Sequence, residues 1–102
     1  MTPQYGYNMS ETVKVIKLTS GDELIARVTE ETDSTITIKN IRTIQAVPTS
    51  VQGAVGMALV PYMVMVSDDE PIFINKSNTL VVTLPKADIE KSYLSQVSGI
   101  TL

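Results

Sequence analysis

The 102-residue chain contains no cysteine and no histidine. Without cysteine it can form neither a disulfide nor a thiolate metal site, and without histidine it lacks the most common general base and transition-metal ligand. Most hydrolytic and metal-dependent chemistry is therefore excluded. The carboxylates that could act as acid or base, Glu23, Asp33 and Asp68, have no partner that the sequence identifies. We expect a protein that is not an enzyme and carries no cofactor.

Long apolar runs are also missing. No segment reaches the ~18 to 20 unbroken apolar residues that span a bilayer, and the N-terminus has no basic region followed by an apolar core. We therefore expect a soluble, cytoplasmic protein with no membrane partner. The formal net charge of −3, with 8 basic residues, argues against bulk attraction to nucleic acid but leaves room for a local basic ring.

What the chain does contain is a strand pattern, clearest in residues 13–40. Apolar and polar residues alternate with a period of two in residues 24–29 and again in residues 35–39. Turn-forming residues at 19–22 and three acids near 30–33 separate three short strands. In the first strand the apolar phase changes midway, which predicts a bulge or bend of the kind that curls small sheets into barrels.

The strand pattern resumes in residues 41–47 and is broken by turn-forming residues at 48–56. Residues 57–66 are apolar on both faces, which suits either a buried strand or a strand whose outer face meets another subunit. The second interpretation predicts a subunit interface formed by Met57, Leu59, Tyr62, Met63 and Met65. Both interpretations stay open at this point.

Two further strands are expected at residues 72–74 and 79–84, joined by a polar turn at residues 75–78. They follow three adjacent acids, Asp68, Asp69 and Glu70, which could hold a cation. No calcium-loop spacing surrounds these acids, so a solvated turn is the favoured interpretation.

The two ends of the chain differ from its middle. Ile89, Tyr93 and Val97 recur every four residues, which predicts an amphipathic helix over about residues 86–98 that packs on the barrel mouth or on a neighbour. Residues 1–10 are polar and favour a flexible N-terminal arm. The alternative for this arm is that its tyrosines dock on a neighbouring subunit or stack on a base.

Five or six short antiparallel strands followed by one helix predict a mostly β fold. We expect a small, strongly bent antiparallel open barrel with a C-terminal helix, which fills residues 11–102 as a single domain.

Residues 13–40 (VKVIKLTSGDELIARV through ITIKN) resemble the first motif of the Sm-like (LSm) family, to which the bacterial Sm-like RNA chaperone belongs. Gly21 lies in the first turn and Lys39–Asn40 close the third strand. Residues 73–85 (FINKSNTLVVTLP) resemble the family's second motif. The resemblance implies an Sm-like (SH3-like) barrel whose edge strands pair between subunits into a homo-oligomeric ring of five to seven copies. A phage or bacterial source is a hypothesis from the same resemblance.

Members of this family bind uridine-rich or adenosine-rich single-stranded RNA around the ring pore. The resemblance assigns RNA contacts to Asn75, Lys76 and Asn78 in the turn at residues 75–78 and to Thr37 beside the acidic turn near residue 33. Ser34, Thr35 and Thr37, beside the acidic turn, offer no aromatic side chain on which a base could stack. Any RNA binding is therefore expected to be weak and salt-dependent.

Two functions of different classes follow. The first is a non-catalytic Sm-like ring that binds single-stranded RNA weakly at its pore. The alternative is an oligomeric assembly module that binds protein partners, through residues 57–66 or the terminal helix, and binds no nucleic acid.

Overall fold

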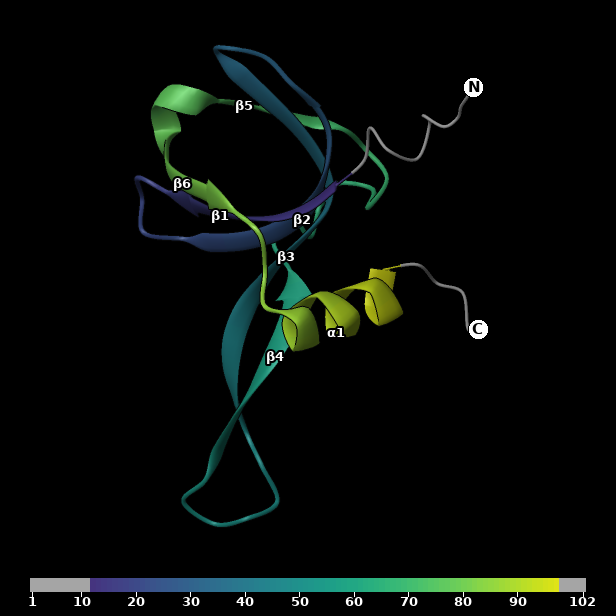
Figure 1. Ribbon diagram of the computed structural model, residues 1–102. Coiled ribbons are helices and arrows are strands. Elements are labelled where there is room, and N and C mark those ends of the chain that lie inside the picture. Colours follow the sequence, from purple (N-terminus) through teal and green to yellow (C-terminus); the bar gives the residue numbers. More distant parts are fainter. Residues whose placement is uncertain (1–11, 98–102) are drawn as a thin grey trace.

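The computed structural model describes residues 12–97 and shows one antiparallel sheet with a C-terminal helix (Figure 1). The strands are β1 (Thr12–Leu18), β2 (Glu23–Glu31), β3 (Thr35–Pro48), β4 (Val55–Pro61), β5 (Ile72–Asn75) and β6 (Thr79–Thr83). A short 3₁₀ helix, η2 (Lys76–Asn78), joins β5 to β6, and α1 (Ala87–Val97) follows. The predicted mostly β fold with a C-terminal helix is confirmed. The expected arm over residues 1–10 lies outside the described residues.

The sheet has the strand order β4-β3-β2-β1-β6, and β5 pairs with β3. The three strands expected within residues 13–40 are β1, β2 and the first part of β3, joined by two tight turns. Gly21 lies in the first turn with φ of 100°, a conformation that residues with a side chain rarely adopt. In the second turn the Thr32 amide donates to the Thr35 carbonyl at 2.9 Å.

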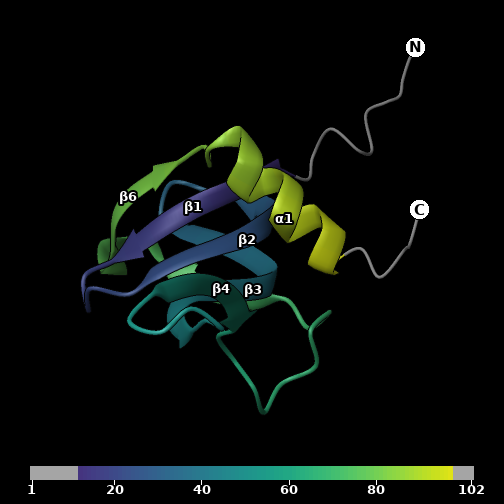
Figure 2. The same cartoon turned by 90° about the horizontal axis from the view of Figure 1, so that it is seen from below.

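The sheet bends because several of its strand pairs are irregular. The pairing of β2 with β3 shifts register twice, and that of β1 with β6 shifts between Lys17 and Leu18. The phase change in the first strand predicts a bulge or bend midway along it, but β1 pairs with β2 regularly from Thr12 to Lys17, and its shift against β6 lies at the end of the strand. Such shifts increase local twist and curl a sheet, and Figure 2 shows the result as a small, bent open barrel.

The barrel interior is formed by alternate residues of neighbouring strands. Ile16 of β1, Ala26 of β2, and Ile36 and Ile38 of β3 are all fully buried. The period-two pattern in the sequence therefore identified the core-facing side of these strands correctly.

β3 belongs to two parts of the molecule. Its first residues pair with β5 in the barrel, and its later residues, from Arg42 onward, pair with β4. Asn40 lies between these halves with a positive φ of 54°. Beyond it, β3 and β4 form a hairpin that extends away from the barrel (Figure 1).

The stretch 57–66 is not one strand. β4 already begins at Val55 and ends at Pro61, and residues 62–66 form turns. Proline has no amide hydrogen to donate to a ladder and a fixed φ, which accounts for the end of the strand at this residue. The expected loop at 48–56 is correspondingly shorter, because the hairpin turn spans only residues 49–54.

The expected helix is present as α1, and it packs on the bend of β3. Tyr93, one of the three residues of the predicted apolar stripe, is completely buried, and Ile89 and Val97 are half-buried. Within residues 12–97, no helix is long and apolar enough to cross a membrane.

Candidate functional site

The two turns that the resemblance assigns to RNA contact lie side by side at one end of the barrel. β5 pairs antiparallel with the start of β3, which places Asn75 opposite Thr35. The Lys76 amide then donates to the Ser34 carbonyl at 2.8 Å. Strand register therefore brings together two short segments that are about forty residues apart in the sequence.

Lys76 is paired with an acid at this end of the barrel. Its Nζ atom lies 2.8 Å from Glu31 Oε2, and Lys14 Nζ lies 3.6 Å from the other oxygen of the same carboxylate. The hydrogen bond from Lys76 is the main cause that holds the pKa of Glu31 below its ordinary value, against a smaller opposing effect of burial. The positive charge predicted to meet phosphate is therefore largely compensated within the chain.

The other predicted RNA contacts differ in accessibility. Asn75 and Asn78 are exposed, so their side-chain amides face solvent beside Lys76. Thr37 is buried in the sheet, where it lies between Glu30 of β2 and Phe73 of β5. Asn75, Lys76 and Asn78 are therefore accessible at the surface, whereas Thr37 is buried.

An apolar surface on the edge strands was not predicted from the sequence. Among the described strands, β5 pairs only with β3 and β6 only with β1, so each has one edge without a strand partner. Phe73 of β5 is 74% exposed, and Leu80 and Val81 of β6 are also largely exposed. The signal was present, because Ile72 and Ile74 alternate with Phe73 and a strand with two inward isoleucines must direct the residue between them outward.

The predicted interface residues do not form one continuous strand surface. Met57 is exposed on the hairpin, and Leu59 is half-buried near the hairpin base. Tyr62 donates its hydroxyl hydrogen to Asp22 Oδ2 at 2.8 Å, which raises the pKa of Tyr62. Met63 and Met65 are exposed in the turns that follow. Three of the five residues therefore lie outside the strand to which the sequence pattern assigned them.

A polar cluster joins the bend of β3 to the helix and to the turn at residue 68. Arg42 donates to both carboxylate oxygens of Asp68, at 2.6 and 3.2 Å, and to Gln96 Oε1 at 2.6 Å. Asn40 Nδ2 donates to Asp68 Oδ2 at 2.9 Å, and the Tyr93 hydroxyl donates to the Asn40 carbonyl at 2.7 Å. These contacts satisfy the polar groups that the bend buries.

The charges in this cluster explain two pKa shifts. The hydrogen bonds from Arg42 are the main cause that lowers the pKa of Asp68 below its ordinary value. Burial raises the pKa of Tyr93 to about 12. Asp68 lies in an exposed turn, as expected, and its carboxylate is also paired with the buried guanidinium of Arg42. No group of three or more acidic side chains in the described part of the chain is arranged to hold a metal ion.

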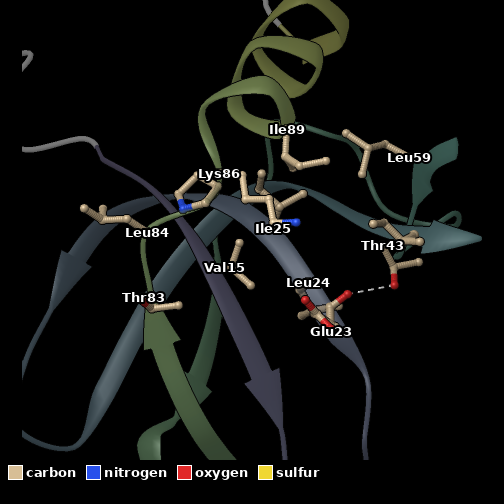
Figure 3. A pocket seen from close by; sticks show the side chains of 12 residues that line it. Val15, Glu23, Leu24, Ile25, Thr43, Leu59, Thr83, Leu84, Lys86 and Ile89 are labelled. Atoms are coloured by element: carbon tan, nitrogen blue, oxygen red, sulfur yellow. Dashed lines mark hydrogen bonds between the residues drawn. The ribbon is translucent and has the colours of Figure 1, made fainter. Parts of the chain in front are cut away.

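An apolar groove of about 310 Å³ lies where the hairpin leaves the barrel (Figure 3). Leu59 lines it from the hairpin, Leu84 from the segment after β6, and Ile89 from α1. Figure 3 shows Leu59 and Ile89 on the same side of the groove as the helix start, with Val15 and Ile25 of the barrel facing them. Most of the residues that line the groove are apolar, and Glu23 and Lys86 are charged. A lining of this kind suits contact with an apolar surface.

The chain was also compared with known proteins. No protein-family model matches it, and no curated protein matches it.

Proposed function

We propose that this protein is a non-catalytic, Sm-like, ring-forming assembly module. The observation that carries the proposal is that, among the strands of residues 12–97, β5 and β6 each have one edge without a strand partner and carry the exposed apolar side chains of Phe73, Leu80 and Val81. Exposed strand edges without charged residues are sites of pairing with another chain.

The two edges belong to different strands, so a contact between the β5 edge of one copy and the β6 edge of the next is heterologous. Contacts of this kind generate a closed ring when the rotation between copies closes. The resemblance of residues 13–40 and 73–85 to the two Sm-like motifs supports five to seven copies. Phe73 and Val81 would then be buried between neighbours.

The electrostatics at the paired turns favour a ring that organises protein partners over one that binds nucleic acid. Glu31 is engaged by two bases, Lys76 at 2.8 Å and Lys14 at 3.6 Å. The charge of Lys76 is therefore already met by a carboxylate of the same chain. Phosphate binding would have to displace that carboxylate, and affinity for nucleic acid depends mainly on free positive charge.

One observation favours the second candidate function, weak binding of single-stranded RNA. Asn75, Lys76 and Asn78 lie together beside the turn at Ser34, and both asparagines are exposed. In a ring this group would repeat around the pore, and amide side chains can hydrogen-bond to base edges. Such binding would be weak and would fall steeply as salt rises, because Lys76 supplies the phosphate contact.

The edge contact is tested by the variant Val81→Glu, which places a charge on the apolar surface of β6. Ser92→Glu, on an exposed position of α1, is the matched control with the same charge change. In multi-angle light scattering we expect the unmodified 11.1 kDa chain and the control to have the mass of at least five copies, and Val81→Glu to have the mass of one or two. An unmodified chain with the mass of one or two copies would remove the ring proposal.

A further inference from the structure

The β3–β4 hairpin has a composition unlike the rest of the chain. Residues 43–67 contain no Asp, Glu, Lys or Arg, although charged residues make up 19% of the sequence. The hairpin nevertheless projects from the barrel (Figure 1). An extended element without charge and with apolar side chains in water is a candidate contact surface.

Strand register separates the two faces of this hairpin. Ile44 lies opposite Leu59, Ala46 opposite Met57, and Pro48 opposite Val55. Residues directly opposite one another project to the same side of a sheet, as do residues two apart along a strand. One face is therefore made only of these six apolar residues, which we call the apolar hairpin face.

The apolar hairpin face is the more exposed of the two. Val55 and Met57 are 66% and 65% exposed, and Ile44 is 42% exposed. The opposite face carries Gln45 together with small or half-buried residues. A hairpin that stays in water normally places polar side chains on its exposed face, and an edge strand such as β4 is normally protected by charge. The hairpin has neither protection.

The apolar hairpin face continues into the groove at its base. Ile44 and Leu59 belong to the face and also line the groove, together with Leu84 and Ile89. Among the described residues that line the groove, Glu23 and Lys86 are charged, and they are opposite in sign. Neither a nucleic acid nor a highly charged peptide would find a complementary charge here.

We infer that a second copy of this chain covers the apolar hairpin face. Two hairpins pack face to face and antiparallel around a two-fold axis, so that the tip of each, near Val51 and Val55, reaches the groove at the base of the other. In a two-fold contact the same surface of both copies takes part, so each contact between two different residues occurs twice. Here the hairpin tip of each copy meets the groove of the other. Sheets packed face to face lie about 10 Å apart and bury such apolar residues between them.

The size of the contact sets its strength. The face spans five residues along each of two strands, 44–48 and 55–59, and projects an area of roughly 16 Å by 10 Å, which is small beside the ~800 Å² per partner of a standard stable interface. Single chains are therefore expected to pair only at high micromolar concentration. The contact uses β3 and β4, whereas the proposed ring uses β5 and β6. Both contacts can coexist, and rings would then join in pairs with the added strength of several simultaneous contacts.

The test compares two variants that add the same charge to opposite faces of the hairpin. Met57→Glu alters the apolar hairpin face, and Gln45→Glu alters the exposed part of the other face. At high micromolar concentration, light scattering should give Met57→Glu half the mass of the unmodified chain, and Gln45→Glu the full mass. This twofold difference in mass is expected whether the unit that pairs is a ring or a single chain. The Met57→Glu test can therefore fail while the Val81→Glu test of the ring succeeds, and the reverse.

A milder substitution covers the case in which Met57→Glu does not fold, as judged by circular dichroism. The chain has no cysteine, so Met57→Cys introduces a single thiol on the apolar hairpin face and Gln45→Cys places one on the other face. A short bis-maleimide should link two copies of Met57→Cys and leave Gln45→Cys unlinked. Equal masses for the unmodified chain and Met57→Glu, or equal cross-linking of the two cysteine variants, would overturn the inference. Both results are expected if a different protein covers this face.

Discussion

The ion pair between Arg42 and Asp68 should be a main source of stability at the bend of β3. Arg42 is 7% exposed, and the shortest distance to the carboxylate is 2.6 Å. Replacing Asp68 by Asn keeps the shape of the side chain but removes the negative charge. Arg42 is then left almost buried without a counter-charge, and the positions of α1 and of the turn at residue 68 lose a shared contact.

The expected cost follows from burial. A hydrogen bond to a charged group contributes about 1.5 to 3 kcal/mol, and an unpaired buried charge costs more. The carboxylate of Asp68 is 45% exposed, so water screens part of the interaction. We therefore expect Asp68→Asn to lower the free energy of unfolding by about 2 kcal/mol, which corresponds to a fall of roughly 8 to 16 °C in Tm for a domain of this size.

The pH dependence provides an independent check. The pKa of Asp68 is lower in the folded chain than in the unfolded chain, so its contribution is complete above the unfolded value and is lost as pH falls through the folded value. The difference in stability between the unmodified chain and Asp68→Asn should therefore be full at pH 7 and shrink below about pH 4. A difference that stays constant or grows as pH falls would contradict the ion-pair explanation.

Urea denaturation followed by circular dichroism, at one fixed protein concentration, measures these differences. Glu70→Gln is the control, because it also removes one negative charge, from an exposed side chain two residues after Asp68. It should change the free energy of unfolding by less than about 0.5 kcal/mol. Equal stability of Asp68→Asn and Glu70→Gln at pH 7 would contradict the ion-pair explanation.

Two further variants test neighbouring contacts. Tyr93→Phe should lower the free energy of unfolding by about 1 to 3 kcal/mol, since it leaves the buried carbonyl of Asn40 without its 2.7 Å hydrogen bond; thermal denaturation that matches the unmodified chain would refute this. Glu31→Gln should free Lys76 and increase the affinity for labelled oligo-U at low salt, measured by fluorescence anisotropy, and Lys76→Ala should abolish the gain. An unchanged affinity in Glu31→Gln would argue against a phosphate contact at Lys76.

Much of the fold could be predicted because its signals are local. The alternation of Leu24, Ala26 and Val28 placed these residues in the core, and all three are buried. The four-residue spacing through Tyr93 located the helix within one residue of the observed bounds. Both patterns depend on residues that are close in the sequence, and burial of one face is sufficient to specify them.

The remaining features depend on residues that are distant in the sequence. Arg42 meets Asp68 across 26 positions, and Tyr93 meets Asn40 across 53. No local pattern marks such pairs. The pairing of Lys76 with Glu31 is hidden for the same reason, and it changes the expected charge at the candidate RNA site. Residues 57–66 were assigned to one strand because Pro61 was interpreted as a bend or an edge position, whereas β4 ends at this residue.

The ring proposal is tested most directly by the native mass of the unmodified chain at low micromolar concentration. Native mass spectrometry should show an assembly of five to seven copies, or two such rings joined together, with no substantial population of single chains. A population dominated by single chains would contradict the proposal that the free edges of β5 and β6 close a ring.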